Sequence, residues 1–499
     1  MIHKVFGPPG TGKTTFLLNT VEKELDSGIL PIDIGYFAFT RKAANEAKDR
    51  AIIKFPNLQG QTDFPWFRTL HSLAYRCLGV KQNDMMSPEH YAEFGKLARL
   101  DMTIEETGEE EGFVKANNPI LNEINLARIK KLDLRTHYNY SRLAIEWWHF
   151  EFVERTYRKY KEEHMLLDFT DLLENINLEP ERLPKLKTVI VDEAQDLSPI
   201  QWDLVKNLID RSEDTYIAGD DDQAIYSWAG ADVKTFLELP GEVRVLDKSY
   251  RIPKSVHRLA DRISSQIKRR QPKSWQAREE EGEIHYHNSV ASVPMEEGSW
   301  LFLAAANYLI DPLHPWLKAQ GVLFERNGNR SISQNILSAV LGWESLRKGN
   351  SISFPVVEQI YKHLGADGIK RGHKSLKTAD PEKLYTMKDL KEDHGLLTDA
   401  IWHEALTRIA EDKRDYIIAL LRRGIKLTST PQVKLSTIHG AKGGEADHVV
   451  FFLDLSSKFA KEYDIRPDDM YRLAYVAATR SKKTLHIVLP EYADRGFRL

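Results

Sequence analysis

Eight residues near the start of the sequence have the types and spacing of a phosphate-binding loop. Gly7-Pro8-Pro9-Gly10-Thr11-Gly12-Lys13-Thr14 matches the pattern G-x-x-x-x-G-K-[ST] and follows the short apolar run 2–6. Glycines let backbone N–H groups curl around phosphate oxygens at the start of a helix. The lysine then neutralises the outer phosphates, and the hydroxyl of Thr14 can ligate Mg²⁺. The loop therefore predicts binding of ATP or GTP, but it does not reveal the reaction.

Two apolar runs further along the chain end in acidic residues. Residues 188–191 lead into Asp192 and Glu193, and residues 216–219 lead into three consecutive aspartates, 220–222. Such runs place carboxylates at the carboxyl ends of buried strands, where ligands gather in open α/β sheets. Asp192 would hold Mg²⁺, and Glu193 would polarise the attacking water. An acidic pair is often only the start of a solvated loop, but next to a phosphate loop we favour the functional interpretation.

The composition limits what these residues can belong to. The 499 residues suggest about three domains at roughly 150 residues each. The net charge is 70 − 73 = −3. If the protein binds an acidic polymer, its basic residues must therefore be concentrated on one part of its surface. Cys77 is the only cysteine, which excludes a disulfide framework, a cysteine-rich zinc site and a cysteine-held iron–sulfur cluster. No apolar stretch is long enough to span a membrane, and the N-terminus does not resemble a signal peptide.

The motifs, taken in order from Gly7 to Arg480, resemble superfamily 1 helicases of the UvrD/Rep type. The resemblance is strengthened by the run Asp220-Asp221-Asp222-Gln223-Ala224-Ile225-Tyr226-Ser227-Trp228, in which a glutamine and two aromatic residues follow the acids. It implies an α/β fold with two RecA-like P-loop motor domains, each with a mainly helical insertion. It also implies DNA-dependent hydrolysis of ATP with Mg²⁺.

The resemblance assigns nucleotide roles residue by residue. The residues implied in catalysis are Lys13, Glu193, Gln223, Arg251 and Arg480. Those implied in holding the nucleotide are Gly7, Pro8, Pro9, Gly10, Thr11, Gly12, Lys13, Thr14, Thr15, Gln195, Tyr250 and Glu445. Thr14 and Asp192 would ligate the metal. Arginine fingers are worth roughly 10³–10⁵ in rate, so supplying Arg251 and Arg480 across a cleft would couple hydrolysis to its closure.

The same resemblance implies a path for single-stranded DNA. The residues on it are Phe39, Thr40, Arg41, His71, Tyr226, Trp228, Arg330, Thr437 and His439. Trp228 has an alternative interpretation as a core residue, but its segment is too polar and glycine-bearing for a core strand. Phe39 and His71 have structural alternatives as well, and the sequence leaves these open.

We expect two interrupted motor halves. The first comprises residues 1–80 and 166–239, with strands near 2–6, 34–39, 189–191 and 215–218, and its insertion is 81–165. The second comprises 240–345 and 429–499, with strands near 243–246, 300–304, 433–437, 449–453 and 485–489, and its insertion is 346–428.

Each insertion carries one notable cluster. In the first, an acidic run around Glu105–Glu111 is expected to form a solvated loop, and Trp148, Phe152 and Tyr160 are expected to pack together along a helix. In the second, the basic residues lie between 370 and 377. We favour a solvated loop there, with a grip on duplex phosphates as the alternative.

The sequence favours an ATP-dependent helicase that moves 3′ to 5′ on single-stranded DNA and unwinds duplex at single-strand/double-strand junctions. The alternatives are a translocase that strips proteins and unwinds poorly alone, a non-catalytic DNA-binding subunit, and a small-molecule kinase. Because the first strand lies at the start of this sequence, we expect no counterpart of the family's adenine-reading glutamine, and adenine would then rest mainly on Tyr250. We expect a trimmed, cytoplasmic, nucleoid-associated motor that is a monomer or weak dimer.

Overall fold

The computed structural model describes residues 1–58, 62–102, 104–105, 115–116, 118–141, 143–295, 297–377 and 379–499. The chain divides into two units. Unit 1 comprises residues 1–282, 461–479 and 498–499, and unit 2 comprises residues 283–460 and 480–497. Each unit has its own sheet of mainly parallel strands.

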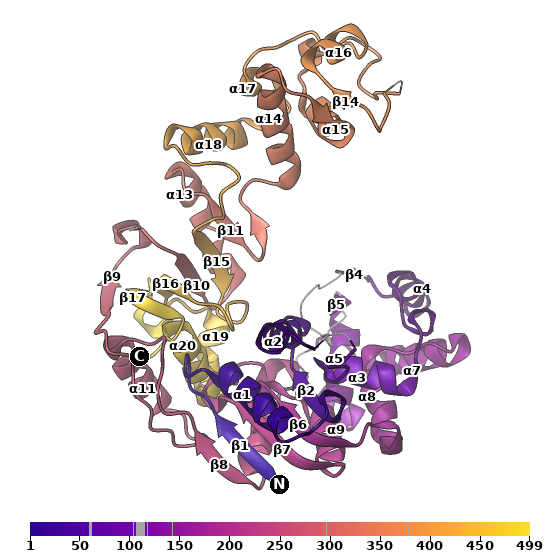
Figure 1. The fold of residues 1–499 in the computed structure, drawn as a ribbon, viewed down its shortest axis with the longest axis vertical. Coiled ribbons are helices and arrows are strands. Elements are labelled where there is room, and N and C mark those ends of the chain that lie inside the picture. Colours follow the sequence, from indigo (N-terminus) through magenta and orange to yellow (C-terminus); the bar gives the residue numbers. More distant parts are fainter. Residues whose placement is uncertain are drawn as a thin grey trace. The chain divides into compact units, whose positions relative to one another are not determined.

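The strands of unit 1 are all parallel and run in the order β3-β2-β6-β7-β1-β8 (Figure 1). They are β1 (Ile2–Phe6), β2 (Ile34–Ala38), β3 (Phe67–Thr69), β6 (Leu186–Val191), β7 (Ser212–Gly219) and β8 (Glu242–Val245). Neighbouring side chains enter different apolar clusters, since Val5 packs on one face and Phe6 on the other. A sheet covered on both faces produces continuous apolar runs, which is why the sequence predicts most of these strands.

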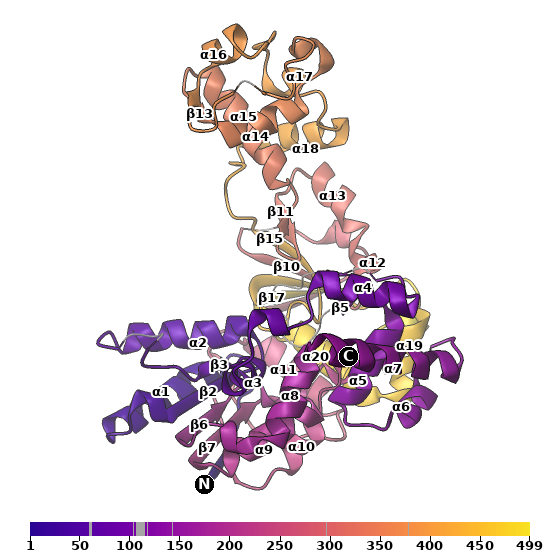
Figure 2. The same cartoon turned by 90° about the vertical axis from the view of Figure 1, so that its right-hand side faces the viewer.

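Helices cover both faces of this sheet. α1 (Lys13–Asp26) and α2 (Arg41–Lys54) supply the cluster on one face. The cluster on the other face is supplied by α3 (Leu70–Leu78), α8 (Phe169–Leu178), α9 (Pro199–Ile209) and α10 (Val233–Glu238). α11 (Lys254–Ser264) and α20 (Pro467–Ala478) pack against each other, although about two hundred residues separate them in the sequence (Figure 2).

Residues between α3 and α8 form a helical group with a core of its own. Its elements are α4 (Pro88–Ala98), β4 (Ile104–Glu105), β5 (Lys115–Ala116), α5 (Pro119–Ile129), α6 (Leu134–Tyr140) and α7 (Trp147–His164). The acidic residues Glu106, Glu109, Glu110 and Glu111 lie outside the described residues.

The expected packing of Trp148, Phe152 and Tyr160 along α7 is wrong for two of the three. Tyr160 is buried, but Trp148 is 67 % exposed and Phe152 is 43 % exposed. The buried face of α7 instead runs through Phe150 and Val153. Because a helix turns by about 100° per residue, Trp148 and Phe152 lie on the opposite side from that face.

In unit 2 the strands run in the order β12-β11-β15-β10-β16-β17-β9, all parallel except β12, which is antiparallel to β11. They are β9 (Glu283–His287), β10 (Trp300–Ala304), β11 (Phe324–Arg326), β12 (Asn329–Arg330), β15 (Val433–Thr437), β16 (Ala446–Phe452) and β17 (Ser481–Val488).

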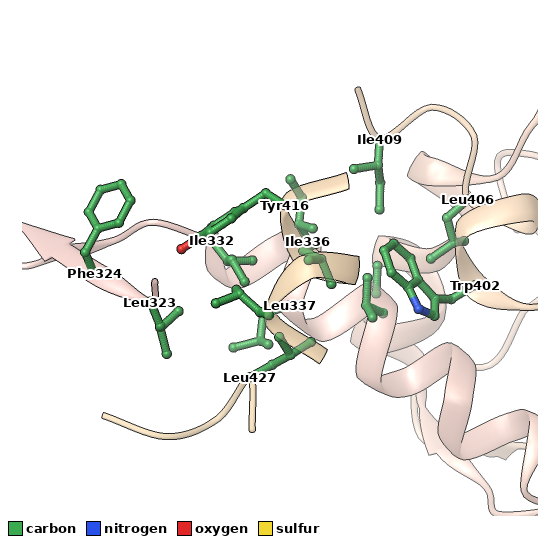
Figure 3. Packing of buried hydrophobic residues seen from close by; sticks show 14 of the residues in the cluster. Leu323, Phe324, Ile332, Ile336, Leu337, Trp402, Leu406, Ile409, Tyr416 and Leu427 are labelled. Atoms are coloured by element: carbon green, nitrogen blue, oxygen red, sulfur yellow. The ribbon is translucent and has the colours of Figure 1, made fainter. Parts of the chain in front are cut away.

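One apolar cluster joins the sheet of unit 2 to its helices. The helices are α12 (Asn307–Ile310), α13 (Leu313–Ala319), α14 (Gln334–Arg347), α15 (Phe354–His363), α16 (Met387–Glu392), α17 (Trp402–Ala405) and α18 (Glu411–Arg422), with a short antiparallel pair of β13 (Ile352–Ser353) and β14 (Leu384–Tyr385). The helix α19 (Ser457–Ile465) follows β16 and contributes no residue to this cluster. Figure 3 shows Trp402 and Leu406 beside Ile336, in the part of the cluster farther from Phe324. α14 to α17 therefore stand at one end of unit 2, continuous with its core.

One strand assignment is corrected by the sheets. The strand expected at 243–246 in the second motor half is β8, which pairs in parallel with β1 in unit 1. The short strands β3, β9 and β11 were not expected, because each is too short or too exposed to give an apolar run. No helix in the described parts of the chain is long and apolar enough to cross a membrane.

Candidate functional site

The phosphate loop connects β1 to α1 at the carboxyl end of the unit 1 sheet. Gly7 donates its amide to the carbonyl of Gly219 on β7 at 2.9 Å, and Thr11 donates its hydroxyl to the carbonyl of Pro8 at 2.8 Å. Gly10 and Gly12 have φ of +73° and +76°, a conformation that glycine adopts without strain. A Cβ at Gly10 would also overlap Arg251. The loop thus needs glycine at both positions.

Lys13 is the first residue of α1 and lies between two carboxylates. Its Nζ is 3.0 Å from Asp192 Oδ1 and 2.5 Å from Glu193 Oε1, at the end of β6. Burial alone would lower the pKa of Lys13, but the charges of the two carboxylates and their hydrogen bonds raise it above its usual value. The ammonium is therefore charged and positioned where phosphates would compete with the carboxylates for it.

Neighbouring groups orient both acidic residues. The buried hydroxyl of Tyr36 on β2 donates to Asp192 Oδ2 at 3.0 Å, and burial together with the charge of Asp192 holds the tyrosine pKa well above its usual range. Glu193 has φ of +56°, which non-glycine residues rarely adopt. Such strain concentrates at functional sites, and here it turns the carboxylate of Glu193 towards Lys13 and Gln195.

Two glutamines continue this chain of contacts along the strand ends. Gln195 donates Nε2 to Glu193 Oε2 at 2.5 Å and accepts the amide of Asp220 on its Oε1 at 3.0 Å. Gln223 donates Nε2 to Asp220 Oδ2 at 2.7 Å. A Cβ at Gly219 would overlap the Gln195 side chain, so this position is kept free of a side chain. The structure thus brings Lys13, Glu193, Gln195 and Gln223 into one connected row.

Thr14 and Asp192 have the chemistry of a magnesium site. Thr14 lies in the first turn of α1 and is half-buried, and Asp192 directly follows β6. Mg²⁺ binds oxygen ligands, usually one or two from the protein with the rest from water and phosphates. Within the described residues no group of three or more acidic, histidine or cysteine side chains forms a self-sufficient metal site. The donor set therefore fits a metal that arrives with phosphate.

The segment after β8 holds the phosphate loop from outside. Ser249 is fully buried and donates its hydroxyl to the carbonyl of Pro9 at 2.7 Å, and Tyr250 donates its amide to the carbonyl of Gly10 at 2.9 Å. Tyr250 is 72 % exposed, as a surface for stacking requires. Arg251 follows directly and lies against Gly10. Tyr250 and Arg251 thus lie in unit 1 together with the phosphate loop, whereas the sequence assigned them to the second motor half, with Arg251 across a cleft from the loop.

Three aromatic side chains lie next to one another beyond the acidic strand ends. The rings of Phe39 and Tyr226 are stacked with centroids 5.9 Å apart, and Trp228 lies 6.4 Å from Tyr226. Trp228 is 52 % exposed, so its alternative interpretation as a core residue is wrong. The residues lining a pocket beside these rings are Phe39, His71, Ile129, Leu173, Asp196, Ser198, Gln201, Tyr226, Ala229 and Ala231.

The polar residues predicted to contact DNA near this pocket differ in burial, charge and hydrogen bonding. His71 is buried, and burial together with the charge of Arg41 lowers its pKa to about 4, so it is neutral at pH 7. Its ring packs edge-on against Phe169. Thr40 caps α2 by accepting the amide of Ala43 at 3.1 Å, whereas Arg41 is exposed. Contacts of these residues with DNA stay a prediction.

The remaining predicted residues lie in unit 2. Arg480 is only 1 % exposed and donates to the carbonyl of Gly444 at 3.3 Å, while Glu445 forms an ion pair with Lys482 at 2.5 Å. Thr437 ends β15 and accepts the amide of Gly440 at 3.2 Å. His439 is half-buried on the same turn.

Arg330 and the basic cluster of unit 2 differ in how far their charged groups are occupied by contacts within the protein. Arg330 donates to the carbonyls of Leu427 and Ser429 at 2.7 and 2.9 Å, so part of its guanidinium has a structural role. The basic residues of the cluster are exposed, and they are Lys370, Arg371, Lys374 and Lys377.

Sequence reasoning missed several residues that shape this site. Tyr36 and Lys273 contact the functional carboxylates from β2 and from the segment after α11. A hydroxyl in the middle of an apolar run was the only signal for Tyr36. Lys273 had none, because a single lysine beside a proline is typical of a surface loop.

Two family models match the chain. The UvrD/REP helicase N-terminal domain matches residues 2–244, and the UvrD-like helicase C-terminal domain matches residues 387–492. Among curated proteins, the ATP-dependent DNA helicases PcrA of Staphylococcus aureus (strain COL) and Staphylococcus epidermidis are each 28 % identical to the chain over 310 residues. These alignments cover 56 % of this chain and 40 % of each relative, so the chain spans less than half the length of the relatives it matches.

Proposed function

Because the chain belongs to the UvrD/REP helicase family, we propose that it is an ATP-dependent DNA helicase that translocates 3′ to 5′ on single-stranded DNA and unwinds duplex. The observation that carries the proposal is the connected row from Lys13 through Glu193 and Gln195 to Gln223, which continues in the same loop to Trp228. A nucleotide site and an exposed stacking surface thus share one short segment, 219–229. That is the arrangement a DNA-stimulated ATPase needs.

The residues around the phosphate loop would divide the work of hydrolysis. Lys13 would exchange its two carboxylate partners for the phosphates of ATP, which frees Asp192 to bind Mg²⁺ with Thr14 and frees Glu193 to accept a proton from water. Mg²⁺ would supply charge neutralisation at the phosphates. Gln195 and Gln223 would respond to the outermost phosphate, and Tyr250 would stack on the adenine. Arg251 and Arg480 would act as arginine fingers.

The aromatic residues would hold the strand. Stacking on aromatic rings is worth about 1–3 kcal/mol per base and tolerates any sequence. Phe39, Tyr226 and Trp228 would stack on bases, and the other predicted contacts would lie along the same path. The near-neutral net charge favours a strand path that depends on stacking as well as on phosphate contacts.

The proposal includes the four-part organisation with insertions at 81–165 and 346–428, with β8 added to the first motor half because it pairs with β1. The 3′-to-5′ direction rests on the similarity of Gln223 and Trp228 to that branch of the family. We further propose junction DNA as the substrate, a monomer or weak dimer, and a cytoplasmic location beside nucleoid DNA.

Strand displacement on matched duplexes with a 3′ or a 5′ tail, with and without ATP and Mg²⁺, tests the proposal. We expect ATP-dependent unwinding of the 3′-tailed duplex only. Unwinding of the 5′-tailed duplex would contradict the direction, and absence of DNA-stimulated ATP turnover would contradict the enzyme. Turnover without displacement on either tail would indicate the translocase that strips proteins.

Substitution of Trp228 isolates the stacking role. Trp228→Ala should weaken binding of single-stranded DNA by about 1–3 kcal/mol and reduce unwinding far more than ATP turnover without DNA. Trp148→Ala is the matched control, since Trp148 is an equally large, exposed aromatic residue on α7. Unchanged unwinding by the Trp228→Ala variant would contradict the proposal that Trp228 stacks on DNA bases.

A further inference from the structure

A buried group of charges supports the loop that carries Gln223. The side chain of Lys273 is fully buried, with Nζ 3.0 Å from Asp220 Oδ1 and 2.8 Å from Asp222 Oδ2, and it also pairs with Asp221. Arg270 donates Nε and Nη2 to the two oxygens of Asp222 at 2.8 and 2.6 Å. One ammonium thus contacts three consecutive carboxylates.

These carboxylates depend on the cations. Three neighbouring carboxylates cannot remain charged away from water without paired positive groups. Burial alone would lower the pKa of Lys273, but the three aspartates raise it above its usual value, and Asp222 likewise raises the pKa of Arg270 against burial. Both side chains are therefore charged at neutral pH, and they hold the loop by charge as well as by shape.

The same loop positions both glutamines of the site. Asp220 accepts Nε2 of Gln223 at 2.7 Å and donates its amide to Gln195 at 3.0 Å. Any displacement of Asp220 would therefore move both side chains that are proposed to meet the outermost phosphate. Lys273 is the only cation that the structure pairs with Asp220 among the described residues.

Contacts on the other side lead to Trp228. Arg472 on α20 donates Nε to the carbonyl of Asp221 at 2.9 Å and lies 3.6 Å from Asp469. Asp469 accepts the hydroxyl of Ser227 at 2.6 Å, one residue before Trp228. The position of the aspartate loop is thus tied both to the nucleotide site and to the stacking surface.

We propose that Lys273 is a positioning residue that fixes the loop 220–223, so that binding of DNA at Trp228 accelerates hydrolysis through Gln223 and Gln195. Lys273 lies outside the segments 2–244 and 387–492 that the two family models match. The inference rests on the proposed function, because it requires ATP turnover that DNA stimulates.

Steady-state ATP hydrolysis of the full chain, with and without single-stranded DNA, tests it. In Lys273→Met the DNA-stimulated kcat should fall about 10²-fold, as expected for a displacement of roughly 1 Å at a catalytic group. KM for ATP should stay within about threefold, because the phosphate loop itself is intact. Lys268→Met is the matched control, since Lys268 is an exposed lysine five residues away, and it should keep wild-type kcat.

A second variant separates positioning from folding. Asp221→Asn combined with Lys273→Met removes the surplus charge, so it should regain thermal stability while its DNA-stimulated kcat stays low. Recovery of kcat together with stability would overturn the inference, because Lys273 would then only neutralise charge. Wild-type stimulation in a folded Lys273→Met protein would overturn it as well. If the wild type itself shows no stimulation by DNA, the proposed function fails first.

Discussion

Unit 1 and unit 2 both bury apolar clusters, but among the described residues unit 1 also buries groups of charged side chains. Besides the ion pairs of Lys13, unit 1 encloses one group in which Lys273 meets the aspartates 220–222 and another in which Arg128 and Lys161 share Asp168 and Asp171. Unit 2 encloses an apolar cluster that runs from its sheet to Trp402, and its ion pairs in the described residues, such as Lys391 with Asp399, join side chains that are at least partly exposed. The charged groups lie beside the proposed site, and the apolar cluster extends away from its sheet.

The difference indicates what each kind of interior is for. Replacing a buried ion pair by apolar residues is often neutral or stabilising, so such pairs are poor devices for stability alone. Their directional bonds instead fix where a loop or helix end lies, as Asp168 does by capping α8. An apolar cluster stabilises without specifying an orientation so strictly. We therefore infer that the buried charges of unit 1 fix the positions of its loops and helix ends, whereas the apolar cluster of unit 2 contributes mainly to stability.

The largest expected effect is at the carboxylate of unit 1 that we propose as the general base. Glu193→Gln should lower DNA-stimulated ATP turnover by about 10²–10⁴-fold, the usual contribution of a general base. Binding of ATP should be retained, because Lys13 and the phosphate loop are unchanged. The measurement is kcat alongside an ATP binding titration, with the exposed Glu238→Gln as the control. Turnover within threefold of wild type would show that Glu193 is not the base.

The next effect tests the buried charges of unit 1. Arg128→Met leaves Asp168 and Asp171 without one of their cations, which should cost about 3–5 kcal/mol in the free energy of unfolding. Arg158→Met is the control: its ion pair with Glu154 is exposed, and its loss should cost about 0.5 kcal/mol or less. Urea denaturation measures both. Equal losses would mean that the buried group adds nothing that a surface pair lacks.

A matching deletion tests the apolar interior of unit 2. Leu406 is fully buried in the cluster, and Leu406→Ala should cost about 2–5 kcal/mol through lost contacts and a cavity. The exposed Leu397→Ala should change stability by about 0.5 kcal/mol at most. ATP turnover by folded Leu406→Ala protein should match the wild type. A loss of turnover without unfolding would show that this cluster also sets the geometry of the site.

The smallest effect concerns pH. The pKa of buried His71 lies near 4 in the folded protein, below its usual value near 6.5. Between these two pH values, His71 is therefore protonated in the unfolded chain and neutral in the folded protein. Between pH 7 and 5 this should lower the free energy of unfolding by about 1–2 kcal/mol, and His71→Gln should remove that part of the decline.

His486 provides the comparison in unit 2. Its pKa is also lowered to about 4, by burial and by neighbouring histidines, and the sign of its effect is the same. His486→Gln should therefore flatten the same decline. Denaturation of each variant at the two pH values measures this. A wild-type pH difference in both variants would contradict the burial of neutral histidine.

The sequence could predict residues whose place in the fold follows from a local pattern. The phosphate loop, Asp192 and Glu193 were predictable because a strand end, a glycine turn and a helix start determine them within a few residues. Trp228 was predictable as exposed because its segment is polar. Those parts of the fold and site are the ones that a short window of chain encodes.

Features set by contacts between distant segments were not predictable. Nothing local to Lys273 indicates that it faces three aspartates fifty residues earlier, and β8 gives no sign that it pairs with β1. The misassigned face of α7 has the same origin, because Trp148 and Phe150 are equally apolar and only the neighbouring helices decide which one is buried. Tertiary packing overrides a pattern that is ambiguous along the chain.

The hydroxyl of Tyr36 would affect ion selectivity at the magnesium site proposed for Asp192. Because it bonds to Oδ2 of Asp192, the carboxylate faces the phosphate loop with Oδ1 alone. Ca²⁺ binds six to eight oxygen ligands and often binds both oxygens of one carboxylate. Mg²⁺ has a smaller octahedral coordination shell and usually binds one oxygen of a carboxylate. Tyr36→Phe would free the second oxygen, and we expect that change to narrow the preference of ATP turnover for magnesium over calcium.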